Sequence, residues 1–267
     1  MSDATDTDRR ARARGALLGL ACGDALGRPV EGATAAAVRD RHGRVTEMLG
    51  ADGSRAGTPT APTARAHETA RRLLGGADTD DQNPTTGTGR PADVLAASVP
   101  YGLVAAATDR RVAAVAASGV GDTDPDATEV CVLLVTLVGA LVDGDDVESA
   151  RSTAQTVAVD RGAPVALRET LAVVGDRAAV TLDTSGGVAA TLETALHEAV
   201  AADTLEEAVV SAVSRGGAAS SLGSVAGAVS GARFGDAAVP RRWLNELRDV
   251  ETLTERADSV AAASLPR

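Results

Sequence analysis

Apolar residues recur at helical spacing along most of the chain, between short polar or glycine-rich stretches. In the first such segment Leu17, Leu18, Ala21 and Leu26 recur near the spacing of a helix face. The pattern predicts helices over residues 8–26, 33–42, 64–74, 92–107, 110–118, 126–143, 146–160, 165–174, 188–201, 205–214, 221–234, 239–247 and 250–263. We therefore predict an all-α fold, an orthogonal bundle of about ten or more helices.

Capping residues and apolar length support individual helices in this list. Proline and aspartates at 124–126 precede the apolar segment Val130–Val142, and residues 203–207 read as a capping box. The segment Val130–Val142 is too short to cross a membrane, which takes about 20 apolar residues. We predict a buried core helix there and no membrane association.

No internal repeat or low-complexity linker divides the chain, so we expect one domain over residues 1–267. The polar N-terminus, 1–9, and the Gly-, Pro- and Thr-rich stretch 75–91 are predicted to be flexible. Residues 157–159 and 180–182 are compatible with strands, but both segments are short and isolated. Gly15 and Gly19 in the first helix predict close packing against another helix, because a helix without side chains on one face admits a neighbouring backbone.

The charged residues indicate a salt-adapted protein. The formal net charge is −11, and all 26 basic residues are arginine. A strongly hydrated carboxylate surface of this kind suits high salt, so we interpret the composition as haloarchaeal. The only aromatic residues are Tyr101, Phe234 and Trp243, and there is no basic cluster studded with aromatics. We therefore predict that the protein does not bind nucleic acid.

Cysteine usage and the N-terminus favour a cytoplasmic location. Cys22 and Cys131 are far apart and lie in apolar stretches, so we expect two small core residues rather than a disulfide. Arg9 and Arg10 ahead of Cys22 also fit a twin-arginine signal with a lipid-modified cysteine. The intervening apolar stretch is too short for that reading to be preferred.

Two sets of motifs resemble the ADP-ribosylglycohydrolase family, which includes the dinitrogenase reductase-activating glycohydrolases. The first set lies near the N-terminus, at Arg14–Ala21, Gly23–Gly27 and Pro29–Glu31. The second lies near the C-terminus, at Thr191–His197, Leu205–Val210, Arg215–Gly217, Val225–Gly235 and Val239–Leu244. The resemblance spans roughly residues 11–262 and implies an orthogonal all-α fold with a central pocket. It also implies hydrolysis of a glycosidic bond to ADP-ribose with two Mg²⁺ or Mn²⁺ ions.

The sequence departs from the two motifs that hold these ions in the family. Thr-Asp-Asp-Thr at the start of an early helix corresponds to Thr60–Thr63, where Ala61 and Pro62 replace both aspartates. Gly-Gly-Asp-x-Asp-Thr at the start of a late helix corresponds to residues 216–221, where Ala218 and Ser220 replace them. A divalent ion without these carboxylates loses most of its attraction to the site. We therefore predict no metal site and no cofactor. The family's central Gly-Asn-Gly stretch is also degraded, with residues 91–100 as its nearest match.

The same two helix starts are expected to bind a ligand. Helix N-termini favour anions, and the loss of carboxylates makes these two more receptive to phosphate. The candidate ligand-binding residues are Thr60, Gly216, Gly217, Ser220 and Ser221. Glu31 is the main acidic residue of the family pocket still in register, and it is a candidate catalytic carboxylate only in an active enzyme.

Three functions follow from these residues, and the first is preferred. The protein is expected to be a non-catalytic family member that binds ADP-ribose or a related nucleotide without metal. The alternatives are an active ADP-ribosyl hydrolase with an atypical site, and a protein–protein interaction module with a vestigial pocket. The hydrolase would use Glu31 with Asp80 and Asp81, but these aspartates lie in the predicted 75–91 loop. The acids at 122–126 are interpreted as a helix cap, and His67 as a solvated or capping residue.

Overall fold

The structure is a computed structural model that describes residues 2–51, 53–75, 90–119, 125–174 and 182–265. These residues form helices and short connections, and their only β contacts are isolated bridges. The α-helices are α1 (Ser2–Gly27), α2 (Ala35–His42), α3 (Ala61–Leu73), α4 (Asp93–Leu103), α5 (Thr108–Ala116), α6 (Pro125–Asp143), α7 (Val147–Asp160), α8 (Val165–Val173), α9 (Val188–Ala201), α10 (Leu205–Ser214), α11 (Ala219–Phe234), α12 (Arg241–Glu246) and α13 (Val250–Ala262). Two 3-10 helices are η1 (Arg28–Val30) and η2 (Asp236–Ala238). The predicted all-α fold of ten or more helices is confirmed.

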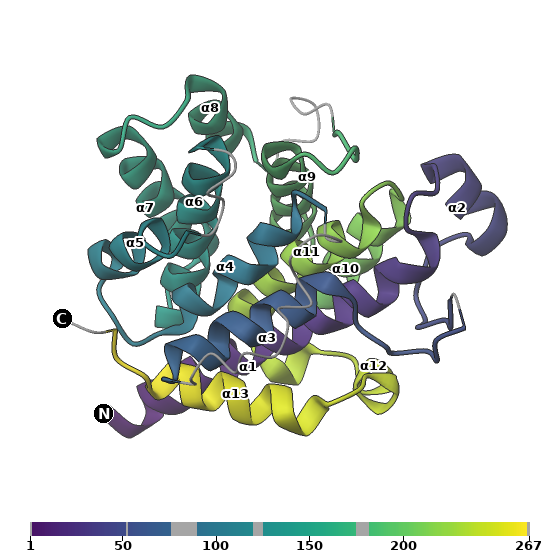
Figure 1. Ribbon diagram of the computed structural model, residues 1–267, viewed down its shortest axis with the longest axis horizontal. Coiled ribbons are helices and arrows are strands. Elements are labelled where there is room, and N and C mark those ends of the chain that lie inside the picture. The colour runs from purple at the N-terminus through teal and green to yellow at the C-terminus, as the bar shows by residue number, and fades with distance from the viewer. Residues whose placement is uncertain (1, 52, 76–89, 120–124, 175–181, 266–267) are drawn as a thin grey trace.

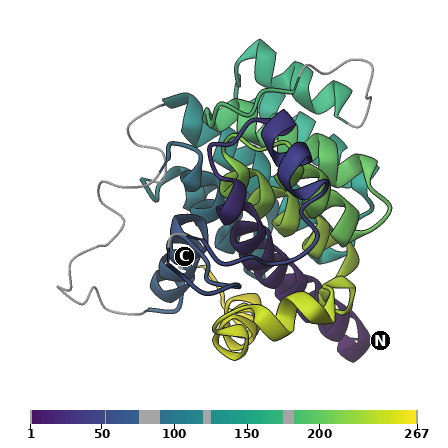
Figure 2. The ribbon, with the colours of Figure 1, turned by 90° about the vertical axis from the view of Figure 1, so that its right-hand side faces the viewer.

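The helices surround the pair α1 and α11. Helices α5 to α8 gather on one side of the molecule, and α2 stands at the opposite side (Figure 1). Seen from the α2 side, α12 and α13, in yellow, lie beneath α1, in purple (Figure 2). No helix in the described part of the chain is both long and apolar enough to span a membrane.

Most helix boundaries lie close to their predicted positions. Helices α9 and α10 have the bounds that the sequence predicts, and the alternative strand at 157–159 lies inside α7. Helix α4 ends at Leu103, earlier than predicted, because Val104 adopts an extended conformation. The loop predicted over 75–91 lies outside the described residues, apart from its ends.

Helix α1 begins at Ser2, earlier than the predicted start of the first helix at residue 8. Arg10 forms an ion pair with Asp6 one turn earlier, at 3.0 Å. The Arg9 side chain donates hydrogen bonds to residues near the ends of α4, α6 and α13. Asp6 and Asp8 therefore lie inside the first two turns of α1, where negative charge is favourable to the helix dipole.

Helices α1 and α11 run antiparallel in close contact along a seam of small residues. Gly15 faces Gly231, Gly19 faces Gly227 and Gly23 faces Gly223. A Cβ atom on any of these glycines would overlap the backbone of the opposite helix. The close approach predicted from Gly15 and Gly19 is confirmed. Its consequence is that the C-terminal end of α1 lies directly beside the N-terminal end of α11.

Two apolar clusters lie on either side of this seam. The larger one is built around α6, which is buried along most of its length. The smaller one contains the fully buried Trp243, whose indole N–H donates to the carbonyl oxygen of Thr46 at 2.8 Å. Cys22 and Cys131 are buried free thiols, as predicted. Burial raises the pKa of the Cys131 thiol to about 12 and that of Cys22 further still, so both remain protonated.

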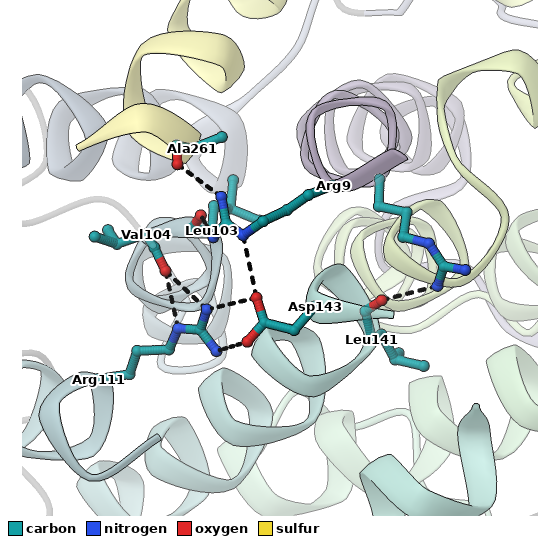
Figure 3. A network of polar contacts seen from close by, with 8 residues as sticks. Arg9, Leu103, Val104, Arg111, Leu141, Asp143 and Ala261 are labelled. Carbon is teal, nitrogen blue, oxygen red and sulfur yellow. Dashed lines mark hydrogen bonds and ion pairs between the residues drawn. The ribbon is translucent and has the colours of Figure 1, made fainter. Parts of the chain in front are cut away.

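An arginine network joins the start of α1 to the ends of α4 and α6 (Figure 3). It lies at the opposite end of α1 from the start of α11. The buried Arg111 pairs with both carboxylate oxygens of Asp143, at 2.7 and 2.9 Å, and donates twice to the carbonyl oxygen of Val104. Arg9 donates to the same Asp143 and to the carbonyl oxygen of Leu103. These guanidinium groups satisfy carbonyls at the end of α4 that have no partner within the helix.

Candidate functional site

A cavity of about 300 Å³ opens where the starts of α3, α4 and α11 meet the end of α1. This volume is at the lower end of the range for small-molecule sites. The lining residues are Arg28, Glu31, Thr60, Ala61, Pro62, Arg90, Asp93, Ser220 and Ser221. Four predicted residues thus come together from distant parts of the sequence: Glu31, Thr60, Ser220 and Ser221.

Asp24 holds the start of α3 against the end of α1. Its carboxylate is fully buried and accepts hydrogen bonds from the backbone N–H groups of Thr60 and Thr63, at 2.7 and 3.2 Å. It also accepts the hydroxyl hydrogens of both threonines, at 2.5 and 2.7 Å. Burial raises the pKa of Asp24, and the four hydrogen bonds oppose that shift. Asp24 therefore closes the first turn of α3, a role that N-cap side chains usually perform locally.

Glu31 plays the corresponding part at the start of α11. The backbone N–H of Ser220 donates to Glu31 Oε2 at 2.7 Å, and the Ser220 hydroxyl lies 3.3 Å from the carbonyl oxygen of Asp24. Burial raises the pKa of Glu31, while the Ser220 N–H and the charge of Arg90 act in the opposite direction. The other carboxylate oxygen, Oε1, is buried and accepts no hydrogen bond from the described residues. It lies 2.5 Å from Arg90 Nε.

Asp93 at the start of α4 completes a closed ring of contacts. Its carboxylate accepts the Ser221 hydroxyl hydrogen and the Arg90 backbone N–H, each at 2.8 Å. The Arg90 side chain pairs with Glu31, and Glu31 binds the backbone of Ser220, which precedes Ser221 on α11. The ring therefore fixes the starts of α4 and α11 and the segment after α1 relative to one another.

Gly216 and Gly217 do not line the cavity, although both are candidate ligand-binding residues. Their φ angles are +69° and +63°, which favour glycine. The Gly217 N–H donates to the carbonyl oxygen of Ala33 at 2.8 Å, and the Gly32 N–H donates to that of Gly217 at 2.7 Å. The two glycines hold the segment after Glu31 against the start of α11 and so position Ser220.

Four residues at this site were not singled out as site residues from the sequence: Asp24, Arg28, Arg90 and Asp93. Asp24 lies inside the Gly23–Gly27 block and Asp93 inside the degraded central stretch. Their positions in these family motifs could have identified both as site residues. Arg28 and Arg90 carried none, because isolated arginines are common in this chain. Their role depends on contacts between segments distant in sequence.

The other candidate residues lie elsewhere or outside the described part of the chain. His67 is half-buried on α3, with Nε2 3.2 Å from Arg256 Nη2, and does not line the cavity. Burial, and then the charge of Arg256, lower its pKa. Asp126 is exposed at the start of α6. Asp80, Asp81 and the acids at 122–124 lie outside the described residues.

The lining residues do not fit a divalent cation. Mg²⁺ requires several oxygen ligands in near-octahedral geometry. Three of the four carboxylate oxygens of Glu31 and Asp93 already accept hydrogen bonds from protein groups. The fourth, Glu31 Oε1, is beside the Arg90 guanidinium, which repels a cation. Throughout the described ranges, no group of three or more His, Cys, Asp or Glu side chains is arranged to hold a metal ion.

Comparison with known proteins places the chain in a family. The sequence model described as ADP-ribosylglycohydrolase matches residues 5–86 and 76–267, so the chain belongs to the ADP-ribosylglycohydrolase family. Among solved structures, the chain is similar to one titled "ADP-ribosylglycohydrolase-related protein complex". The TM-score is 0.80 with 26% sequence identity, over 96% of this chain and 98% of that chain. No curated protein was found to match.

Proposed function

We propose that this family member binds ADP-ribose or a related nucleotide in the cavity between α3, α4 and α11, without a divalent metal and without hydrolysing it. The observation that carries the proposal is the composition of the two helix starts. Thr60, Ala61 and Pro62 at α3 and Ser220 and Ser221 at α11 line the cavity, and none of these residues has a carboxylate.

The absence of hydrolysis follows from how the remaining carboxylates are used. A hydrolase needs a Lewis acid or a general base to activate water. One Glu31 oxygen accepts the Ser220 N–H, and the other is paired with the Arg90 guanidinium. Neither oxygen is therefore free to accept a proton from a water molecule, although burial raises the pKa of Glu31.

The capacity to bind an anionic ligand follows from the charges around the cavity. Arg28 and Arg90 line it together with Glu31 and Asp93. The N–H groups of Thr60, Thr63 and Ser220 at the two helix starts already donate to Asp24 and Glu31, so the two arginines are the main groups left to bind an anion. Arg28 is held in place by its Nη2, which donates to the Ser54 hydroxyl at 2.8 Å. A nucleotide's phosphates fit such a site, since they need positive charge without metal ligands.

Composition supports a salt-rich cytoplasm as the working environment. The net charge of −11 with arginine as the only basic residue type suits a salt-adapted protein. We propose this environment together with the ligand. Binding measurements therefore belong in concentrated KCl, of about 2 M, where the Debye length falls below about 3 Å.

A thermal-shift experiment in KCl tests the proposed function, with ADP-ribose and Mn²⁺ added separately and together. A ligand that binds only the folded protein raises the Tm. We expect ADP-ribose alone to raise it and Mn²⁺ to add nothing. Ala61→Phe fills the cavity and should abolish the shift, whereas Ala64→Phe, at an exposed position of the same helix, should not. A shift that requires Mn²⁺, or release of ADP-ribose from an ADP-ribosylated substrate, would contradict the proposal.

A further inference from the structure

We propose that Arg90 is a fixed positive charge in this cavity, taking the part of a divalent cation, and that it selects ligands that carry a phosphate or carboxylate group. This inference rests on the proposed function in one respect, that the cavity binds a ligand. It goes further in naming the group that selects the ligand.

Arg90 is held from both its backbone and its side chain. Its backbone N–H donates to Asp93 Oδ2 at 2.8 Å, and its Nε lies 2.5 Å from Glu31 Oε1. Asp93 and Glu31 are in turn fixed by Ser221 and Ser220 at the start of α11. The guanidinium group is therefore held in one place before a ligand arrives, which lowers the entropic cost of binding.

The Nη edge of Arg90 is available to a ligand. Glu31 is the only ion-pair partner of Arg90 within the described ranges, and the contact uses Nε. No hydrogen bond joins Nη1 or Nη2 to another described residue, and the side chain is 42% exposed while it lines the cavity. The two Nη atoms of a guanidinium present parallel N–H groups that match two oxygens of a phosphate or carboxylate.

Glu31 positions the guanidinium and does not bind the ligand itself. Its Oε1 is buried and lies 2.5 Å from Arg90 Nε, and its Oε2 accepts the Ser220 N–H. Both oxygens of this carboxylate are therefore occupied by protein groups, and the Nη edge of Arg90 is the part of the pair that a ligand can reach. A sugar phosphate has an anionic group for this edge, whereas a free sugar has none.

Calorimetry with matched ligands and variants tests the inference. The protein is titrated in EDTA and about 1 M KCl with ribose 5-phosphate, ribose and ADP-ribose. We expect Arg90→Gln to weaken both phosphate-bearing ligands about tenfold or more, and Arg90→Lys to restore part of that affinity, since it keeps the charge but not the fork. Arg41→Gln removes an exposed arginine of α2 that does not line the cavity, and it should have no effect. Wild-type affinity in Arg90→Gln would overturn the inference while leaving the proposed function intact.

If the wild-type protein binds none of these ligands, the proposed function fails. A second experiment, on metal binding, then tests the role of Arg90 independently. Ala61→Asp, Pro62→Asp, Ala218→Asp and Ser220→Asp together supply the family's carboxylates. If Arg90 holds the place of the cation, adding Arg90→Gln to this background should tighten Mn²⁺ binding, measured by EPR, about tenfold or more. Unchanged Mn²⁺ affinity would overturn the role of Arg90.

Discussion

Asp24 accepts both the backbone N–H and the hydroxyl hydrogen of Thr60, at 2.7 and 2.5 Å, across a distance of 36 residues in the sequence. The contact fixes the start of α3 to the end of α1. Since the glycine seam fixes the start of α11 to the same end of α1, a single stretch of chain organises both helix starts at the cavity. The site is therefore a product of the packing of α1.

Removing the Asp24 carboxylate should destabilise the protein. Asp24→Ala leaves the donors of Thr60 and Thr63 without their acceptor in a buried position. We expect the free energy of unfolding to fall by about 3 kcal/mol. Denaturant unfolding measures it, with the exposed Asp145→Ala as a control that should change stability by less than about 0.5 kcal/mol. Equal effects of the two substitutions would show that the capping contact is not important.

The titration of Glu31 should make stability fall as pH rises. Burial raises the pKa of Glu31 in the folded protein, so the folded state binds this proton more tightly than the unfolded state. The resulting stabilisation is complete below the ordinary carboxyl pKa of about 4.3 and is lost as pH rises through the raised value. We expect the unfolding free energy of wild type minus that of Glu31→Gln to decrease with increasing pH across this window. A difference that rises with pH would contradict the assignment.

The seam between α1 and α11 should reject even a methyl group. Alanine usually stabilises a helix relative to glycine, by about 0.5–1 kcal/mol. At Gly19 a Cβ would overlap the carbonyl of Gly227, so Gly19→Ala should instead cost about 2 kcal/mol. Gly187→Ala, at the N-cap of α9 where the new Cβ meets only Ala190 at 4.0 Å, is the control for a glycine without overlap and should cost no more than about 1 kcal/mol. Stabilisation by Gly19→Ala would mean that the helices are further apart than described.

The buried arginine network should contribute far more to stability than an exposed ion pair. Arg111→Leu leaves the Val104 carbonyl and Asp143 without their main donor and should cost about 3 kcal/mol or more. Arg10→Leu breaks the exposed pair with Asp6 and should cost less than about 1 kcal/mol. Thermal unfolding of the two variants under the same conditions compares them. Similar losses would contradict the account of Figure 3.

Restoring the four carboxylates of the family motifs should create affinity for Mn²⁺. The variant with Ala61→Asp, Pro62→Asp, Ala218→Asp and Ser220→Asp adds four anionic oxygen donors at the two helix starts. We expect Mn²⁺ to raise its Tm and to leave the Tm of the wild type unchanged. Circular dichroism confirms that the variant is folded. A folded variant with no response would show that these positions do not correspond to the family motifs.

Local signals were sufficient to predict most of the fold. Helix α10 begins at its predicted residue because the Thr204 side chain accepts the Glu207 N–H, as a capping box requires. The start of α1 was missed because acidic residues serve equally well before a helix and in its first turns. The glycines of α1 predicted close packing against another helix, but the sequence did not identify α11 as that helix.

The site was only partly predictable. Thr60, Ser220 and Ser221 were singled out because they stand at the two motif positions, and all three line the cavity. The ring through Arg90 and Asp93 was missed, since it depends on the starts of α4 and α11 and the segment after α1, which meet only in the folded protein. Gly216 and Gly217 do not line the cavity, and their backbone hydrogen bonds hold the segment after Glu31 against the start of α11.

Calorimetric titration of the wild-type protein with ADP-ribose in EDTA tests the central claim most directly. The cavity has two arginines and no carboxylate oxygen free to bind a metal, so we predict binding with an affinity that Mn²⁺ does not change. We also predict that an ADP-ribosylated substrate stays intact in a parallel sample. Binding that appears only when Mn²⁺ replaces EDTA, or turnover of an ADP-ribosylated substrate, would contradict the account and identify an active hydrolase.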